Sequence, residues 1–358
     1  MTPAAVAVLN TGALQHNLGI VRQYAPAAKI SAVIKANAYG HGLLRTARGL
    51  QNVDALAVAR VEEGVSLRNA DIAKRIIVLE GFTCSDELTA LLHYQLEAVV
   101  HCQQQLQMLE QQALQHRLRV WLKLDTGMNR LGFKTAEFAA GYARLMTTPG
   151  IEKPVNIMTH LANADNVQDG KTQQQLALFR QSAADLPGES SIANSAGILA
   201  WPMSIAEWVR PGIMLFGVSP FAANIGADFG LQPVMNLYSR LIAVKSIARG
   251  ESVGYGGQWL SAKATRLGIV AIGYGDGYPR QVASGTPVLV KGVRVPLVGR
   301  VSMDMISVDL TAVPEAKSGD PVTLWGEGLA VEEIARHAGT IPYTLLCGIT
   351  QRVKIVER

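Results

Sequence analysis

The sequence predicts a (β/α)8 barrel, residues 1–230, followed by a mostly β domain, residues 231–358. Between residues 29 and 216, short β-branched runs alternate with segments that have helical spacing of apolar residues. Eight such units favour a closed parallel barrel over an open sheet. After about residue 230, long helical periods nearly vanish. The eight runs are 30–34, 55–59, 76–79, 97–100, 120–124, 155–159, 191–193 and 208–209, the last of which we expect to continue to Phe216.

Local patterns support both parts of this prediction. Within the barrel, segments 135–145 and 172–184 carry apolar residues at helical spacing. In the second domain, Gly-rich turns separate expected strands, and residues 331–337 form one expected helix. The expected strands there are 240–247, 267–272, 288–290, 301–310 and 321–325.

Composition excludes several classes of protein. The 358 residues are 49% hydrophobic and 17% charged, with a net charge of +5 but no basic run, which argues against a nucleic-acid surface. No apolar stretch approaches the ~18 residues of a membrane span, and the first residues do not resemble a signal peptide. Cys84, Cys102 and Cys347 lie far apart, in neither a metal-binding nor a disulfide pattern. We therefore expect a cytoplasmic protein without a metal site.

The most informative lysine follows the first predicted barrel strand, in the segment AVIKANAYGHG. Lys35 lies where that strand ends and a Gly-containing loop begins. Partial desolvation at such a position disfavours the ammonium form and makes a nucleophilic amine accessible. Lys35 could thus form a Schiff base with an aldehyde such as pyridoxal phosphate (PLP). Alternatively, its stem packs on the barrel rim while its head reaches water.

Polar residues follow every predicted barrel strand. Enzymes built on this barrel place their chemistry at the C-terminal ends of the strands. Structural salt bridges could account for a few of these residues, but less easily for the whole set. The residues are Lys35, Arg60, Glu80, His101, Lys123 with Asp125 and Arg130, His160, Asn194 with Ser195, and Arg210 with Gly212.

The last two strands supply candidates for the rest of a PLP site. Asn194 and Ser195 should open a helix, and Gly212 with Ile213 should allow close approach of the backbone to a phosphate. Arg210, which only donates hydrogen bonds, could face the ring nitrogen of PLP and leave it unprotonated. Each has a simpler interpretation: Asn194 and Ser195 as a helix cap, and Arg210 in a surface salt bridge.

Other candidates have structural alternatives as well. His160 could be a satisfied core histidine. Lys123 and Asp125 share one face of a strand and could form an ion pair. Tyrosines in VGYGG (253–257) and GYGDGYPR (273–280) could anchor ordinary turns; neither segment is a nucleotide-binding fingerprint.

These segments together resemble the alanine racemase family. The likeness rests on the segments around Lys35, Arg130, Arg210, Tyr255 and Met303-Asp304, in order over essentially the whole chain. The resemblance implies a PLP enzyme that interconverts L- and D-alanine. It also implies a head-to-tail homodimer whose active sites use both subunits, with the β domain of each subunit completing the partner's site.

The resemblance further implies two bases on opposite faces of the substrate. Lys35 would bond PLP and serve the D face, whereas Tyr255 of the partner subunit would serve the L face. A phenol normally has a pKa near ~10, so Tyr255 needs cationic neighbours to act as a base. By the resemblance, His160 and Arg210 form the hydrogen-bonded chain that provides them. Residues matching phosphate-binding positions are Tyr39, Ser195, Gly212, Ile213 and Tyr343, beside Asn194.

Substrate contacts and a modification are implied as well. Arg130 and the backbone amide of Met303 match groups that hold the substrate carboxylate. Lys123 matches a lysine that is carboxylated by CO2 in many members of the family. The resulting carbamate orients Arg130. Ser302 stands where some members have cysteine. Residues resembling those that line the substrate access channel are Tyr274, Arg280, Arg300 and Asp304.

Two other functions remain as alternatives. A non-catalytic PLP carrier would resemble the barrel alone and would not need Tyr255. An amino-acid decarboxylase on a related barrel would benefit from an acidic partner at the PLP ring nitrogen, where Arg210 is a poor choice. The sequence leaves open whether racemisation supplies D-alanine for peptidoglycan or L-alanine for catabolism.

Overall fold

The computed structural model describes residues 4–112 and 116–358. The chain forms two compact units. One is Leu18–Leu215, and the other combines Met1–Asn17 with Phe216–Arg358. Helix α1 (Thr11–Tyr24) begins in one unit and ends in the other. In the described residues, no helix combines the length and the apolar character that crossing a bilayer requires.

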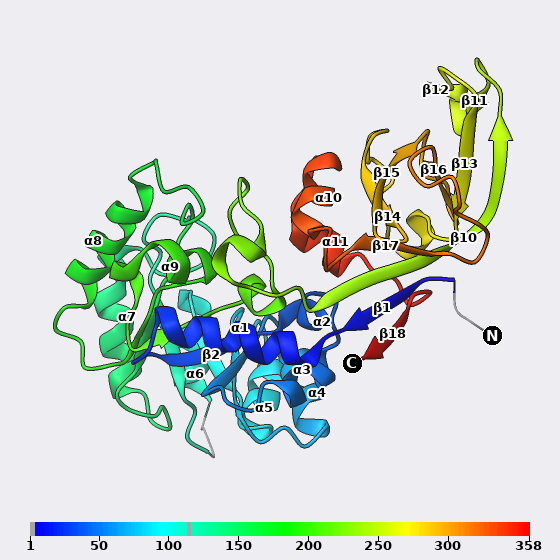
Figure 1. The fold of residues 1–358 in the computed structure, drawn as a ribbon. Helices are drawn as coiled ribbons and strands as arrows, with labels where there is room; N and C mark the ends of the chain where they lie inside the picture. Colours follow the sequence, from blue (N-terminus) through cyan, green and yellow to red (C-terminus); the bar gives the residue numbers. More distant parts are fainter. Residues whose placement is uncertain (1–3, 113–115) are drawn as a thin grey trace. The chain divides into compact units, whose positions relative to one another are not determined.

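The first unit is a closed barrel of eight parallel strands, as predicted (Figure 1). The barrel closes where the first and last strands pair, with Lys29 opposite Trp208 and Ile30 opposite Val209. The strands are β2 (Lys29–Val33), β3 (Ala55–Val58), β4 (Arg75–Val78), β5 (Glu97–Val100), β6 (Val120–Lys123), β7 (Asn156–Met158), β8 (Ser190–Ser191) and β9 (Trp208–Val209).

Helices follow most of the strands and lie around the outside of the barrel (Figure 1). The two predicted helices are confirmed as α7 and α8. They and the remaining helical elements of this unit are α2 (Lys35–Tyr39), α3 (Leu43–Gly49), α4 (Val61–Asn69), α5 (Ser85–His93), α6 (Gln103–Gln111), α7 (Thr135–Thr147), α8 (Lys171–Ala183), α9 (Ser195–Ala200) and the 3-10 turn η1 (Pro202–Ser204).

The last barrel strand is shorter than predicted. The expected continuation to Phe216 is wrong, because β9 ends at Val209 and residues Ile213–Phe216 form the 3-10 helix η2. Pro211 interrupts the strand, since proline has no N–H for a ladder hydrogen bond. The turn that follows brings Gly212 to the C-terminal mouth of the barrel.

A buried carboxylate anchors the opposite, N-terminal end of the barrel. Glu97, at the start of β5, is 5% exposed. It accepts hydrogen bonds from Arg75 Nε (2.5 Å), Arg119 Nη1 (3.3 Å) and Trp121 Nε1 (2.9 Å). Trp121 packs edge-on against Trp208, with 5.7 Å between ring centroids. This network joins β4, β5, β6 and β9 at the end of the barrel that has no predicted site residues.

The second unit is built on an eight-stranded sheet with the order β13-β16-β15-β14-β17-β10-β1-β18. A hairpin, β11 (Ser252–Val253) with β12 (Trp259–Leu260), lies near the tip of this unit (Figure 1). The sheet strands are β1 (Val6–Leu9), β10 (Met235–Ile247), β13 (Thr265–Val270), β14 (Pro287–Val290), β15 (Val293–Val298), β16 (Ile306–Asp309), β17 (Pro321–Trp325) and β18 (Lys354–Glu357).

Sequence and structure differ at a few places in this unit. The predicted helix is confirmed as α10 (Val331–His337), whereas helix α11 (Pro342–Cys347) was not predicted. Only Ile306–Asp309 of the predicted strand 301–310 is a strand. The carbonyls of Ser302 and Met303 instead accept hydrogen bonds from the backbone of Tyr274 and Gly275, both in the 3-10 turn η5 (Tyr274–Asp276). A further 3-10 turn, η3, spans Gly226–Phe229.

Replacing Glu97 by glutamine should weaken the barrel. The Glu97→Gln variant leaves Arg75 and Arg119 without their shared buried carboxylate, so the free energy of unfolding should fall by about 2–3 kcal/mol. Urea unfolding followed by tryptophan fluorescence measures this change. The control is Glu110→Gln, which removes an exposed pair with Arg144 and should change stability by less than about 0.5 kcal/mol. Equal stability of the two variants would contradict this role.

Candidate active site

The barrel mouth carries ten of the predicted site residues, and the second unit carries seven. The first set lies at or just beyond the C-terminal ends of the strands: Lys35, Tyr39, Lys123, Arg130, His160, Asn194, Ser195, Arg210, Gly212 and Ile213. The second set is Tyr255, Tyr274, Arg280, Arg300, Met303, Asp304 and Tyr343.

Other strand-end residues have structural roles. Arg60 and Glu80 form a solvent-exposed pair at 3.9 Å. The ring of His101 contacts the Glu80 carbonyl at 3.0 Å, and Gln105 accepts from the His101 backbone. For Arg60, Glu80 and His101, a structural role in salt bridges and hydrogen bonds therefore fits better than a catalytic one.

Lys35 begins a turn with an uncommon backbone. Ala36, Asn37, Ala38 and Tyr39 all have a φ of 53°, so this short segment is a left-handed turn. For residues with a Cβ, such a conformation costs roughly 1–2 kcal/mol each. Strain of this kind persists only where surrounding contacts enforce it, and it clusters at functional sites.

Side-chain hydrogen bonds enforce the turn. Glu63 Oε1 accepts from the Ala36 N–H at 2.7 Å, while its Oε2 accepts from the Ala59 N–H at 2.8 Å. The carboxylate therefore joins the end of β3 to the residue after Lys35. Asn37 Oδ1 accepts from Leu43 N–H at 2.8 Å.

A buried histidine also holds this turn. His41 Nδ1 lies 3.1 Å from the Ala38 carbonyl and 3.0 Å from the Tyr39 carbonyl. Since carbonyls only accept, Nδ1 carries the proton. Burial lowers the pKa of His41 to about 4, so its ring is neutral at physiological pH.

A small cradle lies between the last two strands. Ser195 Oγ accepts from the Gly212 N–H at 2.9 Å, and Asn194 caps α9 by accepting from Gly197 N–H at 2.9 Å. A Cβ on Gly212 would lie 2.4 Å from Tyr39 Oη, so any other residue there would displace the phenol. A hydroxyl, a phenol and backbone N–H groups thus converge, which is a donor set suited to a phosphate.

Arg210 is buried, not at the surface. It is 5% exposed and donates to Ser191 Oγ (2.6 Å) and the Thr159 carbonyl (2.5 Å). No carboxylate of the described residues pairs with it, so the surface salt-bridge alternative is wrong. Burial lowers its pKa to about 10, which leaves the guanidinium cationic at neutral pH.

His160 is held as a neutral imidazole. Arg210 Nη2 lies 3.4 Å from His160 Nδ1. Because the guanidinium only donates, Nδ1 accepts and the ring proton resides on Nε2. Burial, and then the charges of Arg210, Lys123, Arg130 and Lys35, lower the pKa of His160 well below its usual value.

Lys123 is buried among cations. It is 8% exposed, and burial together with Arg210, Arg130 and Lys35 lowers its pKa to about 8. The Lys123–Asp125 ion pair does not form in the described structure. Asp125 instead pairs with Lys134 at 2.5 Å and accepts backbone hydrogen bonds. The Lys123 amine is therefore partly neutral near pH 8, the form that can react with CO2.

In the second unit, Tyr255 lies in the 3-10 turn η4 (Tyr255–Gly257) between β11 and β12, and is 69% exposed. Arg300, which is exposed, lies outside this hairpin and donates to Gln258 Oε1 in it at 2.9 Å. Tyr343 lies on α11 and is half-buried. Arg280 is exposed.

Two loops of the second unit are tied together. The Tyr274 N–H donates to the Ser302 carbonyl at 3.1 Å. Arg352 bridges the two loops, lying 2.7 Å from Asp304 and 3.2 Å from Asp276. Met303, on the second loop, is 52% exposed. Tyr274, Met303 and Asp304 therefore lie on two loops that are held next to each other.

Sequence reasoning missed two of these positioning residues. Glu63 carries a detectable signal, because a glutamate three residues after the helix N-cap, here Arg60, is typical of a helix N-terminus whose side chain binds back to the preceding backbone. Arg352 carries none, since its two carboxylate partners are 48 and 76 residues away in the chain.

These features define a class, namely enzymes that hold PLP at the mouth of a (β/α)8 barrel. Residues 9–220 match the sequence model of the alanine racemase N-terminal domain, and residues 234–357 match that of its C-terminal domain. The chain therefore belongs to the alanine racemase family, whose members are PLP-dependent isomerases.

Individual relatives agree. An alanine racemase of Aeromonas hydrophila is 53% identical over 350 residues, covering 98% of each chain. The crystal structure of the biosynthetic alanine racemase from Pseudomonas aeruginosa superposes with a TM-score of 0.97 at 43% identity, covering all of both chains. That of Bartonella henselae, with covalently bound pyridoxal phosphate, gives a TM-score of 0.90 at 27% identity, again covering all of both chains.

Replacing Glu63 by glutamine should disturb Lys35 without unfolding the barrel. The Glu63→Gln amide can accept with one atom only, so at least one of the N–H groups of Ala36, Ala59 and Arg60 loses its partner, which costs about 1–3 kcal/mol. We expect roughly tenfold slower racemisation at saturating alanine. The pH profile of the absorbance of the bound PLP should also shift. A purely structural residue would lower the melting temperature and leave that profile unchanged. Glu62→Gln, which alters the exposed neighbour, is the matched control.

Proposed function

We propose that this chain interconverts L- and D-alanine with two bases, Lys35 on the D face and Tyr255 of the partner subunit on the L face. The observation that carries the proposal is the convergence, at one barrel mouth, of Lys35, the Ser195–Gly212 cradle and a buried Arg210. The family relationship over the whole chain supports it.

The proposed proton movements balance in both directions. PLP, when bound, draws electron density from the substrate Cα and so acidifies its proton. From L to D, the Tyr255 phenolate accepts the Cα proton on one face while the Lys35 ammonium delivers a proton to the other. From D to L, the Lys35 amine accepts and the Tyr255 hydroxyl delivers. His160 and Arg210 support Tyr255 through their hydrogen bond.

Arg210 sets the kind of chemistry that the site favours. A donor-only cation facing the ring nitrogen of PLP keeps that nitrogen unprotonated. The ring then withdraws less electron density from the substrate, and this favours proton exchange at Cα over decarboxylation. The decarboxylase alternative is therefore a poor fit. A non-catalytic carrier does not account for the matching C-terminal domain, residues 234–357.

The cations at the barrel mouth would also bind the anionic groups of the cofactor and the substrate. The cradle of Tyr39, Asn194, Ser195, Gly212 and Ile213 would hold the phosphate, joined by Tyr343. Arg130 and the Met303 N–H would hold the substrate carboxylate. The lowered pKa of Lys123 supports its conversion to a carbamate, whose negative charge would orient Arg130.

We also propose a homodimer in which the β domain, residues 231–358, completes the site of the partner's barrel, residues 1–230. Among the described residues, nine of thirteen exposed large apolar side chains lie in the second unit, including Tyr255, Tyr274 and Met303. Apolar exposure of this extent is typical of interaction surfaces. The loops with Tyr274, Arg280, Arg300 and Asp304 would line the access channel.

The cellular role that we favour is supply of D-alanine for peptidoglycan in the cytoplasm. The Pseudomonas aeruginosa enzyme is described as biosynthetic, which supports this role over L-alanine breakdown.

Deuterium exchange at Cα tests the two bases. In D2O, Tyr255→Phe should slow deuterium exchange from L-alanine by about 10²–10⁴-fold, the usual contribution of a positioned base. Exchange from D-alanine should be less affected, because Lys35 remains. Lys35→Ala should lose the absorbance of lysine-bound PLP and both exchange reactions. NMR of alanine Cα–H and optical rotation give the readouts.

The control for the first variant is Tyr24→Phe, which changes another exposed tyrosine. Normal exchange from L-alanine in Tyr255→Phe would rule out its assigned role.

A further inference from the structure

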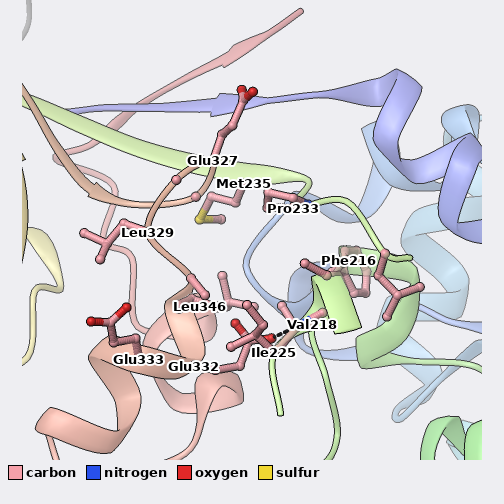
Figure 2. Close-up of a pocket in the computed structure, with 18 of the residues that line it drawn as sticks. Phe216, Val218, Ile225, Pro233, Met235, Glu327, Leu329, Glu332, Glu333 and Leu346 are labelled. Atoms are coloured by element: carbon pink, nitrogen blue, oxygen red, sulfur yellow. Dashed lines mark hydrogen bonds between the residues drawn. The ribbon is translucent and has the colours of Figure 1, made fainter. Parts of the chain in front are cut away.

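A cavity lies within the second unit. Its volume is about 480 Å3, a size suited to a small ligand. Its lining comes from residues 216–235, Arg294 of β15, the turn 326–330, α10 and Leu346 of α11 (Figure 2). Most of the wall is apolar, and Val218, Met235, Leu329 and Leu346 are each at most 2% exposed.

One buried carboxylate belongs to this apolar wall. Glu332 is 5% exposed and lies near Val218 and Ile225 in Figure 2. Its Oε1 accepts from the Ser219 N–H (2.9 Å) and the Gly226 N–H (2.8 Å). No side chain of residues 4–112 or 116–358 donates a hydrogen bond to its Oε2 or forms an ion pair with it.

The carboxylate is held at an energetic cost. Burial raises the pKa of Glu332, although the backbone N–H groups of Ser219, Glu332 itself and Gly226, and the charge of Arg336, oppose the rise. A buried anion is stable when its remaining acceptor positions are filled. A charge-assisted donor at Oε2 would therefore relieve a cost that the chain alone leaves in place.

The other charges around the cavity do not provide that donor. Arg294 forms a two-bond pair with Glu333, at 2.6 and 3.1 Å. Arg336 is exposed and donates to the Ala222 carbonyl at 3.2 Å. Glu327, also exposed, adds a third acid to the lining. Three acids against two arginines leave an excess of negative charge beside an apolar wall.

We propose that this cavity binds a small alkylammonium ion. Its N–H group donates to Glu332 Oε2, and its alkyl chain packs among Val218, Met235, Leu329 and Leu346. Charge complementarity selects a cation, and the apolar wall selects a short hydrocarbon body over a hydrated metal ion.

Binding to the PLP-loaded enzyme tests the proposal. The probe is N,N-dimethylbutylamine, because a tertiary amine cannot condense with the PLP aldehyde. N,N-dimethylbutanamide is its neutral analogue. Calorimetry at about pH 8, far above the ordinary glutamate pKa and below that of an alkylamine, should show the amine binding at least about tenfold tighter than the amide.

Two variants locate the site. Glu332→Gln keeps an acceptor for Ser219 and Gly226 but places an NH2 group at the position of Oε2, so the preference for the amine should disappear. Val218→Phe fills the cavity and should abolish binding of both compounds. Glu315→Gln, an exposed acid outside the lining, should change neither.

Several results would overturn the proposal. They are equal binding of amine and amide by the unmodified enzyme, a preference that survives Glu332→Gln, binding that survives Val218→Phe, or no amine binding up to about 10 mM. Because the first and last of these need no variant, the test holds even if a substitution prevents folding.

Discussion

Repulsion among cations at the barrel mouth is the constraint on which the site depends. Closing eight strands places Lys35, Lys123, Arg130 and Arg210 within electrostatic reach of His160. Asp125, the acid nearest in sequence to Lys123, is engaged by Lys134. The mouth therefore keeps a surplus of positive charge in a partly dry environment. Such a site lowers the pKa of the Lys123 amine and of the His160 imidazole. It also attracts anions such as a phosphate or a carboxylate.

The rest of the barrel keeps this unfavourable cluster in place. Arg210 gives its N–H groups to backbone carbonyls and a serine, so it stays fixed without an acid to neutralise it. Glu63 holds the left-handed turn that begins at Lys35. At the other end, Glu97 joins the strands through two arginines and a tryptophan. The Glu97 network thus supplies stability at the end of the barrel away from the mouth.

The sequence revealed the strands and the residues at their ends, because periodicity and position in the chain carry that information. It could not reveal the left-handed turn, since nothing local marks Ala36–Tyr39 as strained. Nor could it show that Asp125 pairs with Lys134 and not Lys123, because the loop between them decides the geometry. β1 joins the sheet of the second unit through pairing with β10, a contact between residues more than 200 positions apart. Such long-range pairing leaves no periodic signal.

The proton state of His160 tests the central claim most directly. Nitrogen chemical shifts of 15N-labelled histidine, with the His160 signal assigned through a His160→Gln variant, report both charge and tautomer. If the cation cluster governs the mouth, His160 stays neutral, with its proton on Nε2, through the whole range around pH 6.5 in which an ordinary histidine gains its proton. A His160 signal that titrates near pH 6.5, or one that carries its neutral proton on Nδ1, would contradict the account.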